Sequence, residues 1–383
     1  MKKEYILSIV IPTKNRYPYL FQLIELIESF NYDEIELIIQ DNTEDNSLFL
    51  EYLENHQYKH LKYFHIKEQI SVSENSTEAI LNSTGEYVCF IGDDDGVTRY
   101  IVDAVKWMKD NNITTLKSAG AILKWPSYIS TSYYKVSGTA IFNDFSMTYK
   151  IVDAKACLKK LLTTGISTLD FMPKTYNGIT KRTTLEKIYK KCGTYFPGPS
   201  PDMANAVTLA LEDDFYAFVD APIIIGGHSG HLGGNASRYK RQCGPLEEQP
   251  FISKVYIDNR NPRIPKVWSP TTIWPASAIT ALQAYKVSEY LGIVDYEKIL
   301  DKFIVANPDK TDMALALSKN PSALLKSSQI SKLKRLVRGC LNVLLFIIFN
   351  KYDGKKVHRG ISNIMEAEKL ITDKIRKFDL KQG

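Results

Sequence analysis

The 383-residue chain lacks the patterns that mark several common protein classes. Its five cysteines form no CxxC pair and show no Cys/His metal spacing, so we expect reduced thiols rather than disulfides or a structural zinc site. No GxGxxG follows the first predicted strand, and no GxxxxGK[ST] occurs anywhere. These absences argue against a dinucleotide-dependent dehydrogenase and against a P-loop enzyme.

Targeting and membrane-spanning signals are missing as well. Residues 1–5 lead straight into a strand-like run and lack the apolar stretch and cleavage site of a signal peptide. No segment reaches the roughly 18 apolar residues that a bilayer span needs. The apolar content of 44%, the charged content of 24% and the net charge of +6 are ordinary for a soluble globular protein. We therefore expect a cytoplasmic protein without a nucleic-acid partner.

What is present in the first hundred residues is an alternation of strands and helices. Short apolar runs typical of buried strands occupy residues 7–11, 35–40, 61–65 and 87–91. A helix with one apolar stripe follows the first run. The capping-box pattern Ser71-x-x-Glu74 opens another helix, which Gly85 can close. This alternation predicts an α/β fold with an open, mostly parallel sheet covered on both faces.

Polar side chains follow three of the four predicted strands. Residues 13–16 follow the first strand, 41–43 the second and 93–95 the fourth. In parallel α/β sheets, ligands bind outside the carboxyl ends of the strands. The convergence of three polar loops on one edge therefore predicts a nucleotide site there.

The most informative stretch is the run of three aspartates, Asp93, Asp94 and Asp95, at the end of a buried strand. Two unit charges about 4 Å apart repel by roughly 4 kcal/mol at an effective dielectric near 20. A divalent cation or protonation usually compensates such crowding, and oxygen-only ligands favour Mg²⁺ or Mn²⁺. The alternative is a solvated acidic turn.

Together these segments resemble family 2 glycosyltransferases with the GT-A fold. Ser8–Arg16 resembles the opening strand and loop of that family, and Ile38–Asn42 resembles the second strand with its base-recognising aspartate. Asn75, then Gly85–Val88, then the aspartate run is similar to the approach to the family's DxD-type motif. The resemblance covers residues 6–110 well and continues weakly to about residue 240.

The resemblance implies a nucleotide-sugar site with Mn²⁺ or Mg²⁺. The side chains that it assigns to the donor are Pro12, Thr13, Asn15, Arg16, Asp41, Asn75, Asp93 and Arg238. The implied metal ligands are Asp94, Asp95, His228 and His231. The family often has Asp where Gly92 stands, so the aspartate that binds the metal directly stays open. A carboxylate only accepts hydrogen bonds, so Asp41 suits the N3–H of uracil or thymine; an Asx turn is the alternative.

A stiff, proline-rich loop delivers Asp202 to the start of a predicted helix. In inverting enzymes of this resemblance, an Asp or Glu in this region is the general base that takes the proton of the acceptor hydroxyl. The alternative for Asp202 is a helix N-cap, and the rival bases are Glu212, Asp213 and Asp214.

Two further segments resemble parts of the family's acceptor half. Phe171–Gly178 is similar to an acceptor patch of related bacterial sugar transferases, which assigns Tyr176 to the acceptor. Phe218–Ile225 is predicted to be one more strand, and the glycine-rich stretch after it is either a loop that closes over the diphosphate or a linker.

The C-terminal part has a different composition. Residues 270–320 are predicted to be helical, and no acidic residue occurs from Lys326 to Tyr352. Basic residues flank the apolar run Leu341–Phe349, which is too short to span a bilayer. Such a helix fits in-plane binding to anionic lipid; a buried helix or a dimer contact is the alternative. Residues 361–383 are predicted to form a polar amphipathic helix.

These observations give the following expectation. The predicted domains are a GT-A catalytic domain (1–240, with a nucleotide half 1–110 and an acceptor half 111–240), a helical extension (241–325) and a basic amphipathic membrane-association region (326–383). The predicted enzyme is an inverting, metal-dependent hexosyl- or N-acetylhexosaminyltransferase, peripheral on the inner face of the cell membrane. It moves a sugar from a nucleoside-diphosphate sugar, UDP-linked in our prediction, to a hydroxyl of a lipid-linked or oligosaccharide acceptor in O-antigen or capsule synthesis. The QxxRW motif of processive relatives is missing, so we expect one sugar per encounter.

Two other functions remain open from the sequence. The first is a nucleotidyl- or sugar-phosphate transferase that uses the same metal site. The second is a catalytically silent, membrane-associated binding subunit of a glycan assembly complex. The oligomeric state is not predicted.

Overall fold

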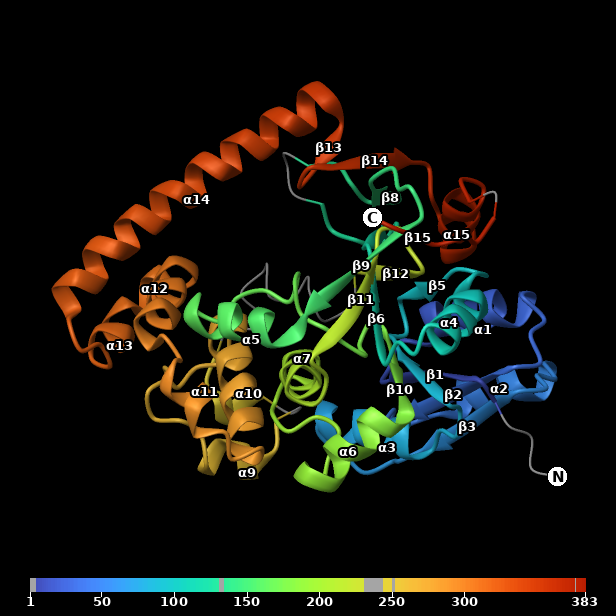
Figure 1. Cartoon of the computed structure of the whole chain (residues 1–383), viewed down its shortest axis with the longest axis horizontal. Coiled ribbons are helices and arrows are strands. Elements are labelled where there is room, and N and C mark those ends of the chain that lie inside the picture. The colour runs from blue at the N-terminus through green and yellow to red at the C-terminus, as the bar shows by residue number, and fades with distance from the viewer. Residues whose placement is uncertain (1–4, 131–133, 231–243, 250–251, 376) are drawn as a thin grey trace.

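The structure is a computed structural model that describes residues 5–130, 134–230, 244–249, 252–375 and 377–383. It is a mixed α/β protein with two β-sheets, helices on both sides of the central sheet and a helical C-terminal region (Figure 1). This confirms the expected fold class.

The central sheet has nine strands in the order β15-β9-β11-β6-β10-β4-β1-β2-β3. The four strands predicted from the first hundred residues are β1 to β4, which pair in parallel. The strand bounds are β1 (Leu7–Thr13), β2 (Ile35–Asp41), β3 (Leu61–His65), β4 (Tyr87–Phe90), β6 (Thr115–Ser118), β9 (Thr148–Asp153), β10 (Ile179–Lys181), β11 (Phe215–Val219) and β15 (Lys381–Gln382).

Helices cover both faces of this sheet, which is why its inner strands are apolar on both sides. The crossover helices are α1 (Tyr17–Ser29), α2 (Ser47–Asn55), α3 (Val72–Leu81) and α4 (Ile101–Asp110). The apolar stripe of α1, with Leu20, Leu23 and Ile24, packs in one core with β1 and β2, while Ile80 of α3 packs in another core on β4.

The capping box at the start of α3 is confirmed: Ser71 Oγ accepts the Glu74 N–H at 3.2 Å, and Glu74 accepts the Ser71 N–H at 2.7 Å. The prediction that Gly85 closes this helix is wrong, because the helix ends at Leu81 with Asn82 as its C-cap. Gly85 instead lies against β1, where a Cβ atom would stand 2.6 Å from the Ser8 backbone nitrogen. Packing therefore excludes any side chain at this position.

A second sheet of six strands has the order β13-β14-β8-β7-β12-β5. Its strands are β5 (Gly96–Val97), β7 (Ala121–Lys124), β8 (Thr139–Phe142), β12 (Ile224–His228), β13 (Lys351–Tyr352) and β14 (Lys355–Arg359). The single strand expected over Phe218–Ile225 is therefore two strands, β11 and β12, in different sheets. The chain changes sheet at 220–222, where Asp220 accepts backbone N–H groups of Ser146 and Thr148 and Pro222 has no N–H to donate.

The helical region expected over residues 270–320 is confirmed. It packs on the α/β body, where α10 and α12 share an apolar core with α5 and α7. The helix bounds are α5 (Ala154–Thr163), α6 (Arg182–Cys192), α7 (Pro201–Glu212), α9 (Lys254–Asp258), α10 (Pro270–Ala284), α11 (Ser288–Gly292), α12 (Tyr296–Ala306) and α13 (Thr311–Leu315), with 3₁₀ turns η1 (Leu246–Glu248) and η2 (Pro308–Lys310).

The C-terminal segment begins with the long helix α14 (Pro321–Phe349), which stands clear of the body along its middle (Figure 1). After α14 the chain returns to the body: β14 pairs with β8, β15 pairs with β9, and α15 (Ile364–Thr372) contacts α1. Residues 350–383 thus pack in the α/β body, unlike the separate region expected from residue 326. Within the described chain, no helix combines the length and apolarity that a membrane crossing requires.

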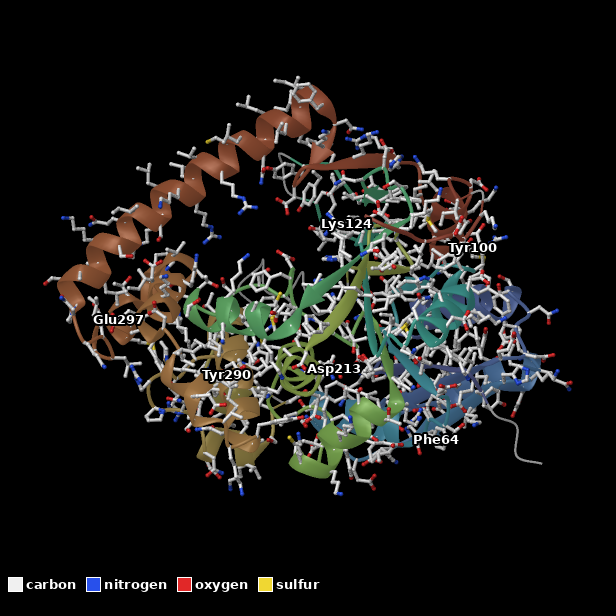
Figure 2. All side chains as sticks on the ribbon, viewed as in Figure 1. Phe64, Tyr100, Lys124, Asp213, Tyr290 and Glu297 are labelled. Carbon is white, nitrogen blue, oxygen red and sulfur yellow. The ribbon has the colours of Figure 1, made fainter. Side chains whose placement is uncertain are left out.

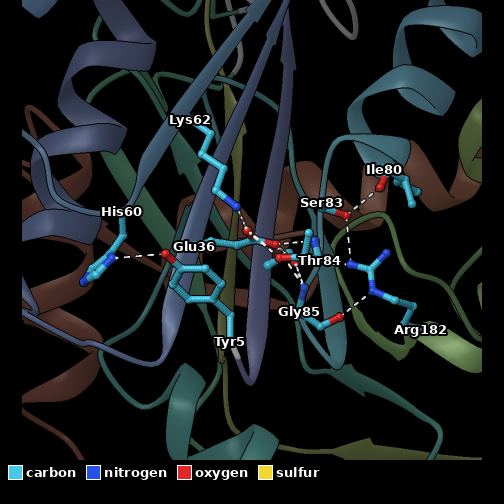
Figure 3. A network of polar contacts seen from close by, with 10 residues as sticks. Tyr5, Glu36, His60, Lys62, Ile80, Ser83, Thr84, Gly85 and Arg182 are labelled. Atoms are coloured by element: carbon cyan, nitrogen blue, oxygen red, sulfur yellow. Dashed lines mark hydrogen bonds and ion pairs between the residues drawn. The ribbon is translucent and has the colours of Figure 1, made fainter. Parts of the chain in front are cut away.

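A buried carboxylate ties β1, β2 and the turn before β4 together (Figure 3). Glu36 of β2 is fully buried and accepts hydrogen bonds from Ser8 Oγ at 2.6 Å, Thr84 Oγ1 at 2.9 Å and the Gly85 N–H at 3.0 Å. Lys62 Nζ completes the set at 2.5 Å. Burial by itself would raise the pKa of Glu36, but these hydrogen bonds outweigh it and lower the pKa below its ordinary value.

We expect Glu36→Gln to reduce the free energy of unfolding at pH 7 by about 3 kcal/mol, because the amide NH₂ group cannot accept the hydrogen bonds that Ser8, Thr84 and Gly85 donate to the buried carboxylate. Since the folded pKa of Glu36 is lowered, its contribution is present above the ordinary pKa and disappears as the pH falls through the lowered one. Urea unfolding of both proteins at pH 7 and at pH 3 measures this difference.

The matched control is Glu34→Gln, which removes an ion pair to Lys106 whose two side chains are about half exposed. We expect that change to alter the free energy of unfolding by less than about 1 kcal/mol. Equal losses in the two variants, or a Glu36→Gln loss that does not shrink at pH 3, would contradict the role given to Glu36.

Candidate functional site

The three aspartates form the turn that follows β4, at the carboxyl ends of the parallel strands β1, β2 and β4. Asp95 points into the protein: its carboxylate accepts the Gly92 N–H at 2.7 Å and the Gly227 N–H of β12 at 2.6 Å. Asp95 therefore shapes the turn and joins it to the second sheet, while Asp93 and Asp94 face the loop after β1.

Arg16 pairs with both of the remaining aspartates. Its Nε lies 3.1 Å from Asp93 Oδ1, and its Nη2 lies 2.5 Å from Asp94 Oδ2. Thr13 Oγ1 donates to Asp93 Oδ2 at 2.8 Å. Thr13 does not cap α1, whose N-cap position is Arg16 without a side-chain capping bond. The loop after β1 thus supplies a cation and a hydroxyl to the aspartate turn.

The end of β12 closes the other side of this turn. The Ser229 N–H donates to Asp94 Oδ2 at 3.0 Å, and Ser229 Oγ accepts from Arg16 Nη2 at 2.6 Å. Trp125 Nε1 donates to the Asp94 carbonyl at 2.9 Å. A Cβ atom at Gly227 would lie 1.6 Å from the same carbonyl oxygen, so only glycine allows this approach. Three segments far apart in the sequence therefore converge on Asp94.

Burial and mutual repulsion change the proton affinities in this cluster. Burial raises the pKa of Asp93 to about 7, although Arg16 opposes the shift. Burial, followed by the charge of Asp94, raises the pKa of Asp95 to about 7. Burial lowers the pKa of Arg16, but Asp93 and Asp94 outweigh it and raise that pKa overall. The cluster is thus an anionic site that needs a cationic partner.

Tyr176 and Asp202 lie beside this cluster. Tyr176 bridges to Phe90 of β4, which places it next to the turn. The negative charge of Asp95 is the largest cause that raises the pKa of Tyr176, followed by burial, and Asp94 and Asp202 add to it. The structure therefore brings Tyr176, Asp202 and the aspartate run into one site.

The Asp202 carboxylate is only partly used by the protein. Asp202 lies in the first turn of α7, whose N-cap is Ser200. Its Oδ1 accepts the Met203 N–H at 2.7 Å and the Ser200 hydroxyl, whereas Oδ2 makes no hydrogen bond within the described residues. Burial raises the pKa of Asp202, and the nearby Lys174 opposes that shift. A carboxylate with a raised pKa and one unused oxygen has the properties of a proton acceptor.

The alternative general bases, Glu212, Asp213 and Asp214, lie at and beyond the other end of α7 from Asp202. Glu212 pairs with Lys191 and accepts from Tyr285 Oη at 2.9 Å. Asp213 follows the last residue of α7 and accepts from Thr114 and Thr115 at 2.9 and 3.1 Å. Asp214 is exposed beyond the helix.

Asp41 occupies a different setting from the one expected. The side chain is fully buried, and its Oδ2 accepts the hydroxyls of Tyr17 and Tyr63 at 2.5 and 2.8 Å. Its Oδ1 accepts the Thr43 N–H at 2.8 Å, which is the Asx turn that the sequence left as an alternative. Both oxygens serve the protein, so this geometry gives no support to base recognition by Asp41.

The remaining donor-side residues are spread along the same edge. Pro12 and Asn15 lie at and just after the end of β1, and the Asn15 N–H donates to Thr43 Oγ1 at 2.9 Å in a left-handed conformation with φ 58°. Asn75 lies on α3 and its buried Oδ1 has no hydrogen-bond partner among the described residues. Such an atom is a candidate ligand contact.

Two of the three residues expected in the glycine-rich stretch, His231 and Arg238, lie outside the described residues. His228 is described: its Nδ1 lies 3.0 Å from Lys124 Nζ, which Figure 2 labels. The structure therefore directs His228 toward a cation and not toward the aspartate run.

Sequence reasoning missed Trp125, Ser229 and Lys174. The indole of Trp125 and the backbone of Ser229 hold Asp94, and Lys174 interacts electrostatically with Asp202 and Asp95. No local pattern marks the first two, because both act through contacts more than 30 residues away in sequence. Lys174 stands two residues before Tyr176 and could have been found with it.

The donor set fits a hard divalent cation in part. No group of three His, Cys, Asp or Glu side chains in the described ranges is arranged to hold a metal. Mg²⁺ and Mn²⁺, however, are commonly bound by one or two carboxylates together with substrate phosphates. Asp94, with Asp93 beside it, offers such oxygens once Arg16 releases them. Asp95 is taken up by backbone N–H groups and His228 faces Lys124, so neither fits the expected ligand role.

Fold and site together define an α/β protein with a ligand site at the carboxyl ends of parallel strands. Residues 8–143, which supply the aspartate run and the loops after β1 and β2, match the family model described as "Glycosyl transferase family 2". This part of the chain is therefore similar to that family, and the resemblance inferred from the sequence is confirmed over these residues.

Several solved structures are similar to the chain. S. aureus TarS shares 15% identity over 85% of this chain and 53% of its own, with a TM-score of 0.43. Residues 1–349 of TarS in complex with UDP-GlcNAc share 15% identity over 93% of this chain and 99% of that structure, with a TM-score of 0.45. The mannosyltransferase PcManGT from Pyrobaculum calidifontis, in complex with GDP-Man and Mn²⁺, shares 17% identity over 87% of this chain and 88% of its own, with a TM-score of 0.39. The chain thus spans about half of the longer TarS structure. No curated protein sequence matches it.

We expect Arg16→Gln to bind Mn²⁺ more tightly than the parent protein when no nucleotide is present. The guanidinium contacts the same carboxylates that would hold the cation, and a unit charge about 4 Å away is worth roughly 4 kcal/mol at an effective dielectric near 20. An increase in affinity of about tenfold or more follows. Electron paramagnetic resonance of free Mn²⁺ measures it.

The control is Lys14→Gln, which removes a neighbouring cation that bonds to Asn42 and not to the aspartates. Its Mn²⁺ affinity should equal that of the parent. Unchanged or weaker Mn²⁺ binding by Arg16→Gln would show that Arg16 does not compete with the metal.

Proposed function

We propose that the protein is an inverting, metal-dependent and non-processive glycosyltransferase that uses a nucleoside-diphosphate sugar. One observation carries the proposal. The segment that matches family 2 supplies the aspartate turn, and Tyr176, beside that turn at Gly92, interacts electrostatically both with the turn and with Asp202 from outside the segment. A donor clamp and a proton acceptor near one tyrosine are the parts that sugar transfer to a hydroxyl needs.

The proposed donor is a UDP-sugar with its diphosphate beside Arg16, Thr13 and Asp94. Arg16 is attached to the start of α1 and already contacts two carboxylates. A guanidinium binds phosphate oxygens in the same forked geometry, so Arg16 can pass from the carboxylates to the diphosphate. Asp93, held by Thr13 at 2.8 Å, would accept from the ribose hydroxyls. A cation held by Asp94 would supply Lewis-acid stabilisation of the leaving diphosphate.

The proposed transfer exchanges one C–O bond for another and moves one proton. The acceptor hydroxyl oxygen attacks the anomeric carbon, the bond from that carbon to the diphosphate oxygen breaks, and the hydroxyl proton passes to Asp202 Oδ2. No covalent intermediate is required, so the anomeric configuration inverts. Tyr176, which lies beside the aspartate turn and interacts electrostatically with Asp202, is suited to contact the acceptor. Asp202 is suited to the proton because burial already raises its pKa.

We expect Asp202→Asn to keep donor binding and to lose catalysis. An amide cannot take the proton, and general-base catalysis contributes roughly 10²–10⁴-fold. The measurements are the thermal shift caused by UDP-GlcNAc with Mn²⁺, which should persist, and the release of UDP from that donor, which should fall by about 10²-fold or more.

The matched control is Asp213→Asn, just beyond the end of α7, where the carboxylate accepts from two threonines. Asp213→Asn should lose stability and keep the rate of UDP release per folded molecule. A parent protein that releases pyrophosphate instead of UDP would favour the nucleotidyltransferase alternative. A parent protein that binds donor and never turns it over would favour a binding subunit.

We also propose that α14 lies on an anionic membrane, where a lipid-linked acceptor of the O-antigen or capsule type would be presented. Every residue from 332 to 341 is exposed, although Arg335 donates to the Val305 carbonyl at 2.9 Å and Arg338 lies 3.8 Å from Asp353. The apolar side chains on its outward face recur at helical spacing and are 50–64% exposed: Ile330, Leu333, Val337, Leu341, Leu344 and Ile348.

Charge selects anionic lipid as the partner of this face. Lys332, Lys334 and Arg338 alternate along the helix with the apolar stripe, Arg335 faces the body at the Val305 carbonyl, and α14 carries no acidic residue. Each basic residue near an anionic surface contributes roughly 1 kcal/mol, and the apolar stripe adds to this by insertion among the headgroups. The protein would then be peripheral on the cytoplasmic face of the membrane.

We expect the double variant Val337→Asp/Leu344→Asp to bind phosphatidylglycerol vesicles about tenfold or more weakly. Two apolar side chains that would insert into the membrane are removed, and two negative charges that the lipid repels are added. Vesicle sedimentation measures this. Leu48→Asp/Leu50→Asp on α2, where both leucines are also exposed, is the control and should bind as the parent does. Unchanged binding of the α14 variant, or loss of a dimer instead, would refute the membrane proposal.

A further inference from the structure

The segment that carries Tyr176 lies alongside the end of β4. The Phe90 N–H donates to the Thr175 carbonyl at 3.3 Å, and the Asn177 N–H donates to the Phe90 carbonyl at 2.8 Å. Tyr176 forms a β-bridge with Phe90, and the centroids of the two rings are 5.4 Å apart. The Tyr176 hydroxyl oxygen lies 3.1 Å from the position that a Cβ atom at Gly92 would take. The segment therefore places this hydroxyl beside the first residue of the aspartate turn.

The side chain of Asn205 ties the Tyr176 segment to α7. Asn205 Oδ1 accepts the Thr175 N–H at 2.8 Å. Because a backbone N–H only donates, the accepting atom must be the amide oxygen. Asn205 and Thr175 are both fully buried. Asn205 follows Asp202 by three residues, so the two side chains lie on one face of α7. The bond therefore joins the helix of the proposed base with the segment of Tyr176.

Stability alone does not account for an amide at this position. Asn205 Nδ2 is buried and has no hydrogen-bond partner among the described residues. A buried donor without a partner costs free energy, which offsets the gain from satisfying the Thr175 N–H. An unsatisfied polar group in a folded protein calls for a functional reason. The place of Asn205 between the base and the tyrosine suggests that reason.

We propose that Asn205 is a positioning residue, which sets the Asp202 carboxylate against the aspartate turn by holding the Tyr176 segment to α7. The inference rests on the proposed function, because it takes Asp202 as the general base. One turn of α7 connects Asp202 with Asn205. The hydrogen bond to Thr175 and the β-bridge at Tyr176 then connect Asn205 with the end of β4. A displacement of about 1 Å in a reacting group can lower a rate by about 10²-fold, so this connection bears on catalysis.

The experiment compares the full-length parent protein with Asn205→Leu, which removes the accepting oxygen and retains a side chain of similar shape. We expect kcat for UDP release from UDP-GlcNAc with Mn²⁺ to fall by about tenfold or more, because the base is displaced from the turn. KM for UDP-GlcNAc should stay within about twofold, since no donor contact is removed. A purely structural role would lower the melting temperature and leave kcat per folded molecule unchanged, so equal kcat in the two proteins overturns the inference.

Two further variants separate the bond to Thr175 from the general packing of α7. Asn205→Asp keeps an oxygen that can accept the Thr175 N–H, and burial favours its neutral carboxyl form, so kcat should return to within about threefold of the parent. The control is Thr208→Val, at a fully buried threonine whose hydroxyl donates to the Asn205 carbonyl at 3.0 Å. Thr208→Val should lose stability and keep kcat. An Asn205→Asp variant as slow as Asn205→Leu, or an equal loss of kcat in Thr208→Val, would overturn the inference.

A measurement that needs no turnover separates this inference from the proposed function. Hydrogen exchange of the Thr175 N–H, followed by mass spectrometry of the peptide that contains it, should be about tenfold or more faster in Asn205→Leu and unchanged in Thr208→Val. Unchanged exchange in Asn205→Leu overturns the inference, whatever the activity. A parent protein that binds UDP-GlcNAc and never releases UDP refutes the proposed function, whereas faster exchange in Asn205→Leu would still show that Asn205 holds the Tyr176 segment to α7.

Discussion

The crowding of three carboxylates at the end of β4 is the constraint on which the site depends. Like charges at this spacing repel by several kcal/mol unless cations or hydrogen-bond donors compensate them. Arg16 forms ion pairs with Asp93 and Asp94, and backbone N–H groups at the end of β12 donate to Asp94 and Asp95. The loop after β1 and the end of β12 therefore both contact the aspartate turn. The change of sheet between β11 and β12 makes this possible, because a single long strand would carry Gly227 away from the turn.

The parts of the fold that could be predicted are those encoded by neighbouring residues. Strands β1 to β4 are apolar runs, and the start of α3 is a capping box that Ser71 and Glu74 form locally. The residue types of the site, above all the aspartate run, were equally plain. The role of Gly85 and the break at 220–222 could not be predicted, because both depend on contacts with β1 and with the 146–148 segment.

Asp41 and Asp202 show where residue type stops being informative. Both are single aspartates at the end of a strand or the start of a helix, and a role facing a ligand was expected of each. In the fold, Tyr17 and Tyr63, more than 20 residues away, take up Oδ2 of Asp41, while Asp202 keeps one oxygen without a hydrogen bond in the described chain. The difference lies in which side chains reach each carboxylate, and a linear pattern does not contain that information.

The C-terminal segment connects the membrane proposal with the site. The outward face of α14 is apolar with basic residues beside it, and the hairpin that follows returns the chain to β8. Strand β13 and one short turn separate the end of α14 from β14. If α14 lies in the headgroup layer, the sheet that contains β14 must therefore lie near the same surface. That sheet also contains β12, whose end donates N–H groups to Asp94 and Asp95. The return of the tail to this sheet would thus bring a membrane-bound acceptor toward the aspartate turn.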